Sequence, residues 1–270
     1  MEYDSGMKSQ NNSIAVVTGA SSGIGAASAL ALARTGWKVA ILARREDRLA
    51  ELATTITEAG GEAIIEALDC ADGAAVSAMA DRVRSAWGAP SLVINSAGAG
   101  VWRFLEETSH AEIDSMIGAP YLAAAHTSRA FLGDMIAAGC GGLIHIGSPA
   151  SIIPWPGATA YTASRWALRG LHEGLYQDLR GTGVTTSLVY FGEVSSEYFE
   201  ANPDSYEHIP SVGSFIPAST PERCAEVVLR VVRRPRPVVF FPFALRLMAW
   251  SATLAPGPVR WMIARTGRRH

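Results

Sequence analysis

Cysteine is scarce in this chain, and the few that occur cannot form a disulfide framework or a zinc site. The three cysteines, Cys70, Cys140 and Cys224, are odd in number and far apart. Disulfide scaffolds need paired cysteines, and zinc sites need clustered ones. The scarcity favours a reducing compartment, so we expect a cytoplasmic protein.

A surplus of charge of either sign is also missing. The formal net charge is −2, which argues against a protein that binds nucleic acid through a general basic surface. Residues 1–12 are polar and contain no apolar segment like that of a secretory signal. We expect these twelve residues to be a disordered N-terminal tail.

No apolar run is long enough to cross a membrane. The least charged stretch, Val238–Leu254, is shorter than the roughly 20 residues that a spanning helix needs, and Pro242 and Arg246 interrupt it. Further arginines follow at Arg260, Arg265, Arg268 and Arg269. We expect residues 243–270 to be an apolar and basic tail that packs on its own domain or on a second subunit. The alternative is peripheral contact with a membrane surface.

Hydrophobic residues, in contrast, make up 49% of the 270 residues, enough for the core of one domain. Apolar runs alternate with helical patterns along the chain. Strands are predicted at 14–18, 38–43, 63–68, 91–95, 143–146, 185–190 and 238–241. Helices are predicted at 23–34, 46–59, 71–87, 109–117, 121–138, 159–180 and 221–234. This alternation predicts a single α/β domain over 13–242. Its architecture would be a Rossmann-type, doubly wound parallel sheet with helices on both faces.

A glycine-rich turn, Thr18–Gly25, follows the first predicted strand and precedes a helix. Such a turn lets a pyrophosphate approach the backbone and the positive end of the helix. Two other glycine-containing motifs share features with this turn. Gly19–Gly23 also matches a Gly-x-Ser-x-Gly nucleophile elbow, but that elbow follows several strands, not the first. A Walker loop would need Gly-Lys-Ser/Thr, which is missing.

The second strand ends in Ala43, Arg44 and Arg45. An acid at this position hydrogen-bonds the ribose of NAD, whereas an arginine accommodates the 2′-phosphate of NADP. Arginine suits phosphate because its planar fork can donate two parallel hydrogen bonds. The sequence therefore predicts preference for NADP(H) over NAD(H), carried by Arg44 with help from Arg45. The alternative is that both are solvated charges at the start of a helix.

Over about residues 13–242 the chain resembles the short-chain dehydrogenase/reductase family. The similarity includes the turn at Thr18–Gly25, Leu68-Asp69, Asn95–Gly98, the pair Tyr161 and Arg165, and Phe191–Val194. Ser148 precedes Tyr161 by the spacing of the family's catalytic serine. The resemblance implies a cofactor site made of Gly19, Ser21, Ser22, Gly23, Ile24, Gly25, Arg44, Arg45, Asp69, Cys70, Asn95, Ala97, Gly98, Tyr161, Arg165, Val194 and Ser196.

The same resemblance implies catalytic roles for Ser148, Tyr161 and Arg165. Tyr161 would be the general acid or base, and Ser148 would hydrogen-bond the substrate oxygen. A free tyrosine hydroxyl ionises only near about pH 10, so it needs a nearby cation to work near neutral pH. Residues 161 and 165 share a helix face, so the guanidinium can lie beside the phenol.

Two positions depart from the family pattern. Arg165 stands where the family has lysine, and Pro120 stands near its active-site asparagine. We expect an NADP(H)-dependent oxidoreductase that interconverts a carbonyl and an alcohol on a moderately apolar small molecule. The alternative is a non-catalytic NADP(H)-binding sensor or scaffold that has lost the proton relay.

The substrate loop should span about 195–220, and its apolar residues are compatible with a lid or with simple loop packing. These residues are Tyr198, Phe199, Tyr206, Ile209, Phe215 and Ile216. The resemblance also implies a homodimer or homotetramer built through the helices at 121–138 and 159–180, which carry few charges.

Overall fold

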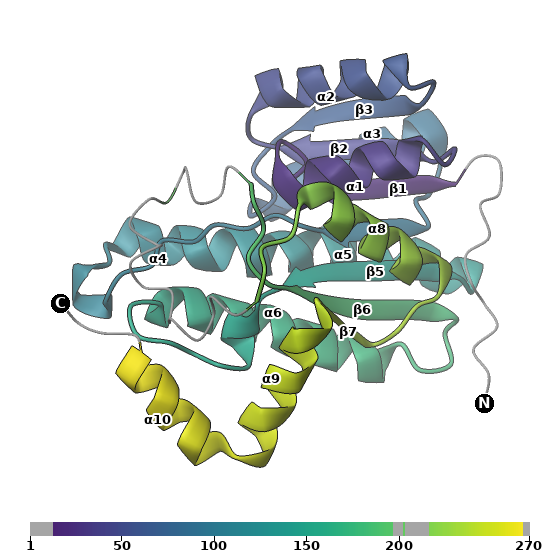
Figure 1. The fold of residues 1–270 in the computed structure, drawn as a ribbon. Helices are drawn as coiled ribbons and strands as arrows, with labels where there is room; N and C mark the ends of the chain where they lie inside the picture. The colour runs from purple at the N-terminus through teal and green to yellow at the C-terminus, as the bar shows by residue number, and fades with distance from the viewer. Residues whose placement is uncertain (1–12, 197–201, 203–215, 267–270) are drawn as a thin grey trace.

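The computed structural model describes residues 13–196, 202 and 216–266 and shows one parallel sheet covered by helices on both faces (Figure 1). The sheet has seven strands in the order β3-β2-β1-β4-β5-β6-β7. The strands are β1 Ile14–Thr18, β2 Lys38–Ala43, β3 Glu62–Ala67, β4 Leu92–Asn95, β5 Gly141–Gly147, β6 Val184–Phe191 and β7 Val238–Phe241. This architecture confirms the predicted single-domain Rossmann-type fold. The N-terminal tail and most of the substrate loop lie outside the described residues, including Tyr198, Phe199, Tyr206, Ile209 and Phe215.

The helices follow the strands in alternation, as the periodicity predicts. They are α1 Gly23–Ala33, α2 Glu46–Glu58, α3 Gly73–Trp87, α4 His110–Ile117, α5 Ala123–Ala138, α6 Thr159–Asp178, α8 Pro221–Arg233, α9 Phe243–Leu254 and α10 Pro256–Thr266. Half of the predicted helix boundaries match, and the other half differ by one or two residues. For example, α3 begins at Gly73, not at 71, because the Asp72 carboxylate caps it by accepting hydrogen bonds from the Ala74 and Ala75 amides.

The core is split between the two faces of the sheet. Val17 and Ile41 pack on one face against α1, α2 and α8, whereas Val16 and Leu42 pack on the other face against α3 and α5. A strand covered on both sides is apolar at most positions, which explains the nearly continuous apolar runs in the sequence. Each large side chain buried in this way stabilises the fold by about 1.5–3 kcal/mol.

The helix predicted to begin at Tyr121 begins instead at Ala123. Between α4 and α5 the chain forms one π-helical turn, η2 Gly118–Leu122, which contains Pro120. Proline has no amide hydrogen to donate into an α-helical ladder, and π turns accommodate such interruptions. Pro120 therefore marks a change of helical pitch within one long helical segment.

The C-terminal tail forms two helices, α9 and α10, which make a V below the β7 side of the sheet (Figure 1). Their inner side chains pack on the domain, because Val259 and Ile263 form a buried cluster with Ile153. In residues 13–196 and 216–266, no helix combines the length and apolarity required to cross a bilayer.

A histidine is buried within the central strand β5. His145 is fully buried, and its Nδ1 lies 3.2 Å from the Asn95 Nδ2. Burial, and secondly the nearby His172, lower the pKa of His145 to about 3. The imidazole is therefore neutral in the folded protein over the physiological range.

We predict that His145 makes folding stability depend on pH. The unfolded chain protonates this histidine below about pH 6.5, whereas the folded chain does so only near pH 3. The neutral imidazole therefore makes its full contribution to the free energy of unfolding above about pH 6.5. That contribution is lost as the pH falls toward 3. In His145→Gln, urea unfolding from pH 7 to pH 4.5 should show a slope of unfolding free energy against pH that is smaller by up to about 1.4 kcal/mol per pH unit.

The exposed His110 provides the matched control. His110→Gln should keep the wild-type slope. Parallel curves for His145→Gln and the wild type would contradict the assignment, whatever the absolute stability of the variant.

Candidate active site

A cavity of about 990 Å³ opens at the carboxyl ends of β1, β2, β4, β5 and β6. The strand order runs from β1 to β3 in one direction and from β4 to β7 in the other. The crevice between β1 and β4, where the order reverses, is the usual ligand site of such sheets. Glycine-containing turns and arginine side chains line one part of the cavity. Aromatic and aliphatic side chains line another part.

The glycine turn forms the first wall, and its glycines are required by close contacts. Gly19 has φ +65°, and a Cβ there would lie 2.8 Å from the Ala97 backbone. Gly23 has φ +56°, and a Cβ at Gly25 would collide with the Gly19 carbonyl. Gly19, Gly23 and Ile24 line the cavity, so the amino end of α1 opens onto it. This backbone cradle fits a pyrophosphate.

Arg45 reaches back to the glycine turn. Its Nη2 donates to the Ser21 Oγ at 3.1 Å and to the Ser22 Oγ at 3.0 Å. Arg44 also lines the cavity, and both guanidinium groups are exposed. The structure therefore groups Arg45 with the two serines, although the sequence suggested Arg44 as the leading arginine.

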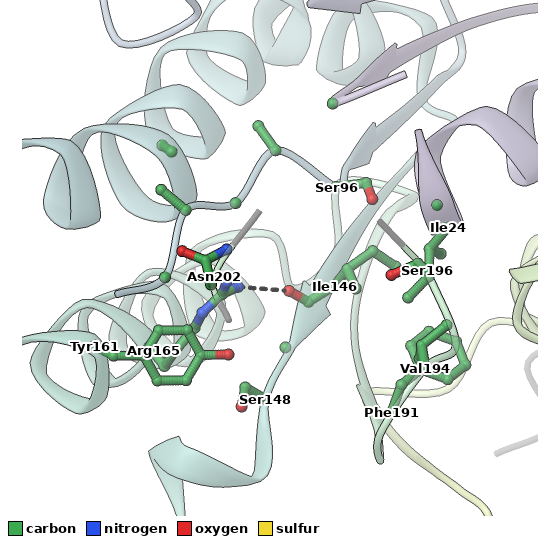
Figure 2. Close-up of a pocket in the computed structure, with 18 of the residues that line it drawn as sticks. Ile24, Ser96, Ile146, Ser148, Tyr161, Arg165, Phe191, Val194, Ser196 and Asn202 are labelled. Atoms are coloured by element: carbon green, nitrogen blue, oxygen red, sulfur yellow. Dashed lines mark hydrogen bonds between the residues drawn. The ribbon is translucent and has the colours of Figure 1, made fainter. Parts of the chain in front are cut away.

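The three expected catalytic side chains lie together, as Figure 2 shows. Ser148 follows β5, while Tyr161 and Arg165 lie one turn apart on α6. All three line the cavity, yet only 7%, 6% and 8% of their surfaces are exposed, respectively. The Tyr161 hydroxyl is directed toward the end of β5 that carries Ser148 (Figure 2).

Arg165 lies against the face of Tyr161. Its Cζ is 4.8 Å from the ring centroid, and its Nη1 donates a 3.5 Å hydrogen bond to the Ile146 carbonyl. Within the described ranges no carboxylate pairs with it, and its Nε is buried without a hydrogen-bond partner. A buried cation without a counter-ion is costly, which is characteristic of a site that binds an electron-rich or anionic group.

Gly98 creates the space for this arginine. A Cβ at Gly98 would lie 2.8 Å from the Arg165 Nη2. The glycine that the sequence suggested for the cofactor site thus also allows a side chain longer than lysine to reach the cavity.

Most of the other predicted cofactor residues line the cavity, but two do not. Asp69, Cys70, Ala97, Val194 and Ser196 are among its walls. Gly25 is not, because it packs against the preceding turn. Asn95 is not either: its Nδ2 donates to the Ser128 Oγ at 3.0 Å. Asn95 therefore links β4 to α5 and β5.

Cys70 and Asp69 differ in chemistry although they are neighbours. Burial, and secondly the charge of Asp69, raise the pKa of Cys70 to about 12, so the thiol stays protonated. The Asp69 carboxylate accepts a 2.9 Å hydrogen bond from the Ala71 amide.

The apolar part of the cavity surrounds Tyr161. Trp102 and Trp155 pack edge to face with their centroids 5.1 Å apart, and Trp102 lies 5.5 Å from the Tyr161 ring. Sequence reasoning missed several further lining residues. These are Ser96, Asp114, Ser115, Asn202, Leu245, Met248 and Ile263. The last three come from the C-terminal helices, and no sequence pattern relates them to the strands they approach.

The family model for the short chain dehydrogenases matches residues 13–207. The chain belongs to this family. Its members are NAD(P)-dependent oxidoreductases, and the resemblance seen in the sequence is therefore confirmed. A short chain dehydrogenase of Pseudocercospora fijiensis is 36% identical over 68% of this chain and 60% of its own length. The chain spans about three fifths of the length of the curated relatives it matches first.

Solved structures of the family are similar over nearly their whole length. A metagenomic short-chain oxidoreductase in complex with NADP has a TM-score of 0.73 at 33% identity, covering 86% of this chain and 96% of its own. A short chain dehydrogenase/reductase from Burkholderia phymatum in complex with NAD has a TM-score of 0.84 at 27% identity, covering 94% of this chain and 97% of its own. The family thus binds either cofactor on this fold.

We predict that Gly19→Ala weakens both folding and NADPH binding. The new methyl group would collide with the Ala97 backbone, in addition to the strain of a positive φ. Urea unfolding should show a loss of about 2 kcal/mol or more, and fluorescence titration should show weaker NADPH binding.

Gly36→Ala is the matched control, because Gly36 also has positive φ (+87°) but nothing lies within 4 Å of its Cβ position. It should cost about 1 kcal/mol through strain alone and leave NADPH binding intact. Wild-type NADPH affinity in Gly19→Ala would show that the turn does not contact the cofactor.

Proposed function

We propose that the protein is an NADP(H)-dependent oxidoreductase that interconverts a carbonyl and an alcohol on a moderately apolar small molecule. The observation that carries this proposal is the convergence of Ser148, Tyr161 and Arg165 at one buried point of the cavity. The glycine turn, whose backbone fits a pyrophosphate, lies on one side of these three residues. The aromatic side chains of Trp102 and Trp155 lie on the other side. A protein that only binds a dinucleotide needs neither the serine nor the tyrosine.

Each of these residues has a definite task in the proposed reaction. The nicotinamide cofactor supplies or accepts the hydride when bound. The Ser148 hydroxyl hydrogen-bonds the substrate oxygen and holds it near the phenol. Tyr161 donates the proton to that oxygen during reduction and takes it back during oxidation. Arg165, against the ring face, stabilises the phenolate that remains.

The proton path must differ from one that uses lysine. A guanidinium stays charged at working pH and cannot pass its own proton on. Pro120 has no side-chain donor or acceptor, and it is not among the cavity walls. The phenolate must therefore regain its proton from water that reaches the cavity. The loss of these two groups is also what favours the second candidate, a non-catalytic NADP(H) sensor or scaffold.

NADP(H) is the preferred cofactor in this proposal because β2 ends in Ala43, where an acid would favour NAD, and two guanidinium groups follow directly. Arg45 is already held beside Ser21 and Ser22, so a 2′-phosphate would meet a preorganised set of donors. We also propose at least a dimer through α5 and α6. Their exposed apolar side chains include Ile136, Trp166 and Tyr176, which a subunit interface would cover.

We predict that Arg45→Ala weakens NADPH binding by about tenfold or more and leaves NADH binding nearly unchanged. A charge-assisted hydrogen bond contributes about 1.5–3 kcal/mol, and only NADPH has the phosphate. Fluorescence titration of both cofactors measures the change. Arg44→Ala is the comparison, with a smaller effect expected. Equal wild-type affinities for NADPH and NADH would contradict the preference.

We predict that Arg165→Met lowers turnover far more than Arg165→Lys, because only methionine removes the cation. Loss of general acid–base function typically costs about 10²- to 10⁴-fold in rate. NADPH oxidation against a diverse carbonyl panel measures turnover, and Tyr161→Phe is the blank. Wild-type turnover in Arg165→Met, with unchanged NADPH binding, would remove the guanidinium from the mechanism.

A further inference from the structure

The most exposed large apolar side chains of the described residues all lie on the two C-terminal helices. They are Leu254, Phe243, Trp261, Trp250 and Leu247, with 52–84% of their surfaces exposed. We call these five the C-terminal apolar face. Four of them fall at the i, i+4, i+7 and i+11 positions of α9, so they form one continuous stripe. Single exposed apolar residues are ordinary, but a stripe indicates a binding surface.

The two helices that carry this face have charges of only one sign. No aspartate or glutamate occurs after Glu226, although the chain as a whole has a net charge of −2. Arg246, Arg260 and Arg265 are exposed on α9 and α10, and none has a carboxylate partner among the residues described. The Arg246 Cζ lies 4.9 Å from the Trp250 ring, and the Arg265 Cζ lies 4.4 Å from the Trp261 ring.

This combination determines what the face can bind. A second copy docking through the same face would place arginines against arginines with no acid between them. The face requires an apolar partner for its stripe and an anionic partner for its guanidinium groups. A bilayer that contains anionic lipids supplies both, as hydrocarbon and as phosphate. Tryptophan and arginine, each apolar along its length and polar at its tip, are suited to the headgroup boundary.

The opposite sides of these helices face the cavity. Leu245 and Met248 of α9 and Ile263 of α10 line it, while Val259 packs with Ile153 beside it. A single layer of helix therefore separates the apolar part of the cavity from the C-terminal apolar face. Figure 1 shows both helices together at one corner of the molecule.

We propose that α9 and α10 dock the protein on the surface of an anionic bilayer through the C-terminal apolar face. We propose further, on the basis of the proposed function, that the apolar substrate enters the cavity from that lipid surface. The helices lie in the interface and do not cross it.

Co-sedimentation of the full-length protein with vesicles tests the docking. Phosphatidylcholine vesicles containing phosphatidylglycerol should pellet the protein at low salt. Pure phosphatidylcholine vesicles should pellet much less, and added salt should release the protein. The double variant Trp250→Ser/Leu254→Ser should bind the anionic vesicles at least about tenfold more weakly. Arg246→Gln/Arg260→Gln should bind the anionic vesicles with a weaker salt dependence than the wild type.

Leu105→Ser is the matched control, since Leu105 in the segment before α4 is 51% exposed, close to the 53% of Trp250, and lies outside α5, α6, α9 and α10. It should pellet like the wild type. Unchanged NADPH binding shows that each variant is folded. Failure of the wild type to pellet with anionic vesicles at low salt would overturn docking. Equal losses of vesicle binding in the double variant and in Leu105→Ser would also overturn it. A lower oligomeric state of the double variant in sedimentation velocity would identify the face as a subunit interface and also overturn the proposal.

The two parts of the proposal fail separately. If the protein pellets but reduces no carbonyl compound, docking stands and the proposed function fails. If it is active and pellets, a long-chain aldehyde delivered in anionic vesicles should show a lower apparent KM for the wild type than for the double variant. A short water-soluble aldehyde should show equal KM values. Equal KM values for both aldehydes would refute entry from the lipid surface.

Discussion

The close approach of two loops at the ends of β1 and β4 is the constraint on which the whole site depends. The Thr18 Oγ1 accepts hydrogen bonds from the Ser96 amide at 3.1 Å and from the Ala97 amide at 3.0 Å. Gly19 leaves no room for a side chain against Ala97. Because the two strands are neighbours in the sheet but belong to different halves of the fold, this contact determines where the crevice opens.

The position of Arg165 follows from that contact. The loop after Ala97 continues directly to Gly98, and the absence of a side chain there admits the guanidinium. The cation then lies between a backbone carbonyl and an aromatic face, which compensate only part of its lost hydration. Such residual cost is typical of functional sites, where stability is sacrificed for chemistry. The same position in a protein without a bound anion or phenolate would favour an uncharged residue.

The cavity has two environments because two kinds of element form it. The strand ends and the glycine turn supply amides and arginines, and their geometry belongs to the shared fold. The apolar part is formed by Trp102, Trp155 and the helices α9 and α10. Both helices follow the last strand, so part of the apolar wall is formed by elements outside the alternation of strands and helices that builds the sheet.

Sequence patterns alone determined the order of the elements, with β1, β2 and β7 at their predicted bounds, because strand and helix periodicity are local properties. They also indicated the glycine turn, whereas the roles expected of Ser148, Tyr161 and Arg165 came from the resemblance to the family. Only the tertiary structure decided which groups meet. Arg45, and not Arg44, contacts the serines of the turn, and Asn95 faces α5 and β5, away from the cavity. The tertiary structure also decided which apolar side chains of the C-terminal helices face the cavity and which face outward. Such outcomes depend on contacts between segments far apart in the chain, and no local pattern encodes the direction in which a side chain meets a distant partner.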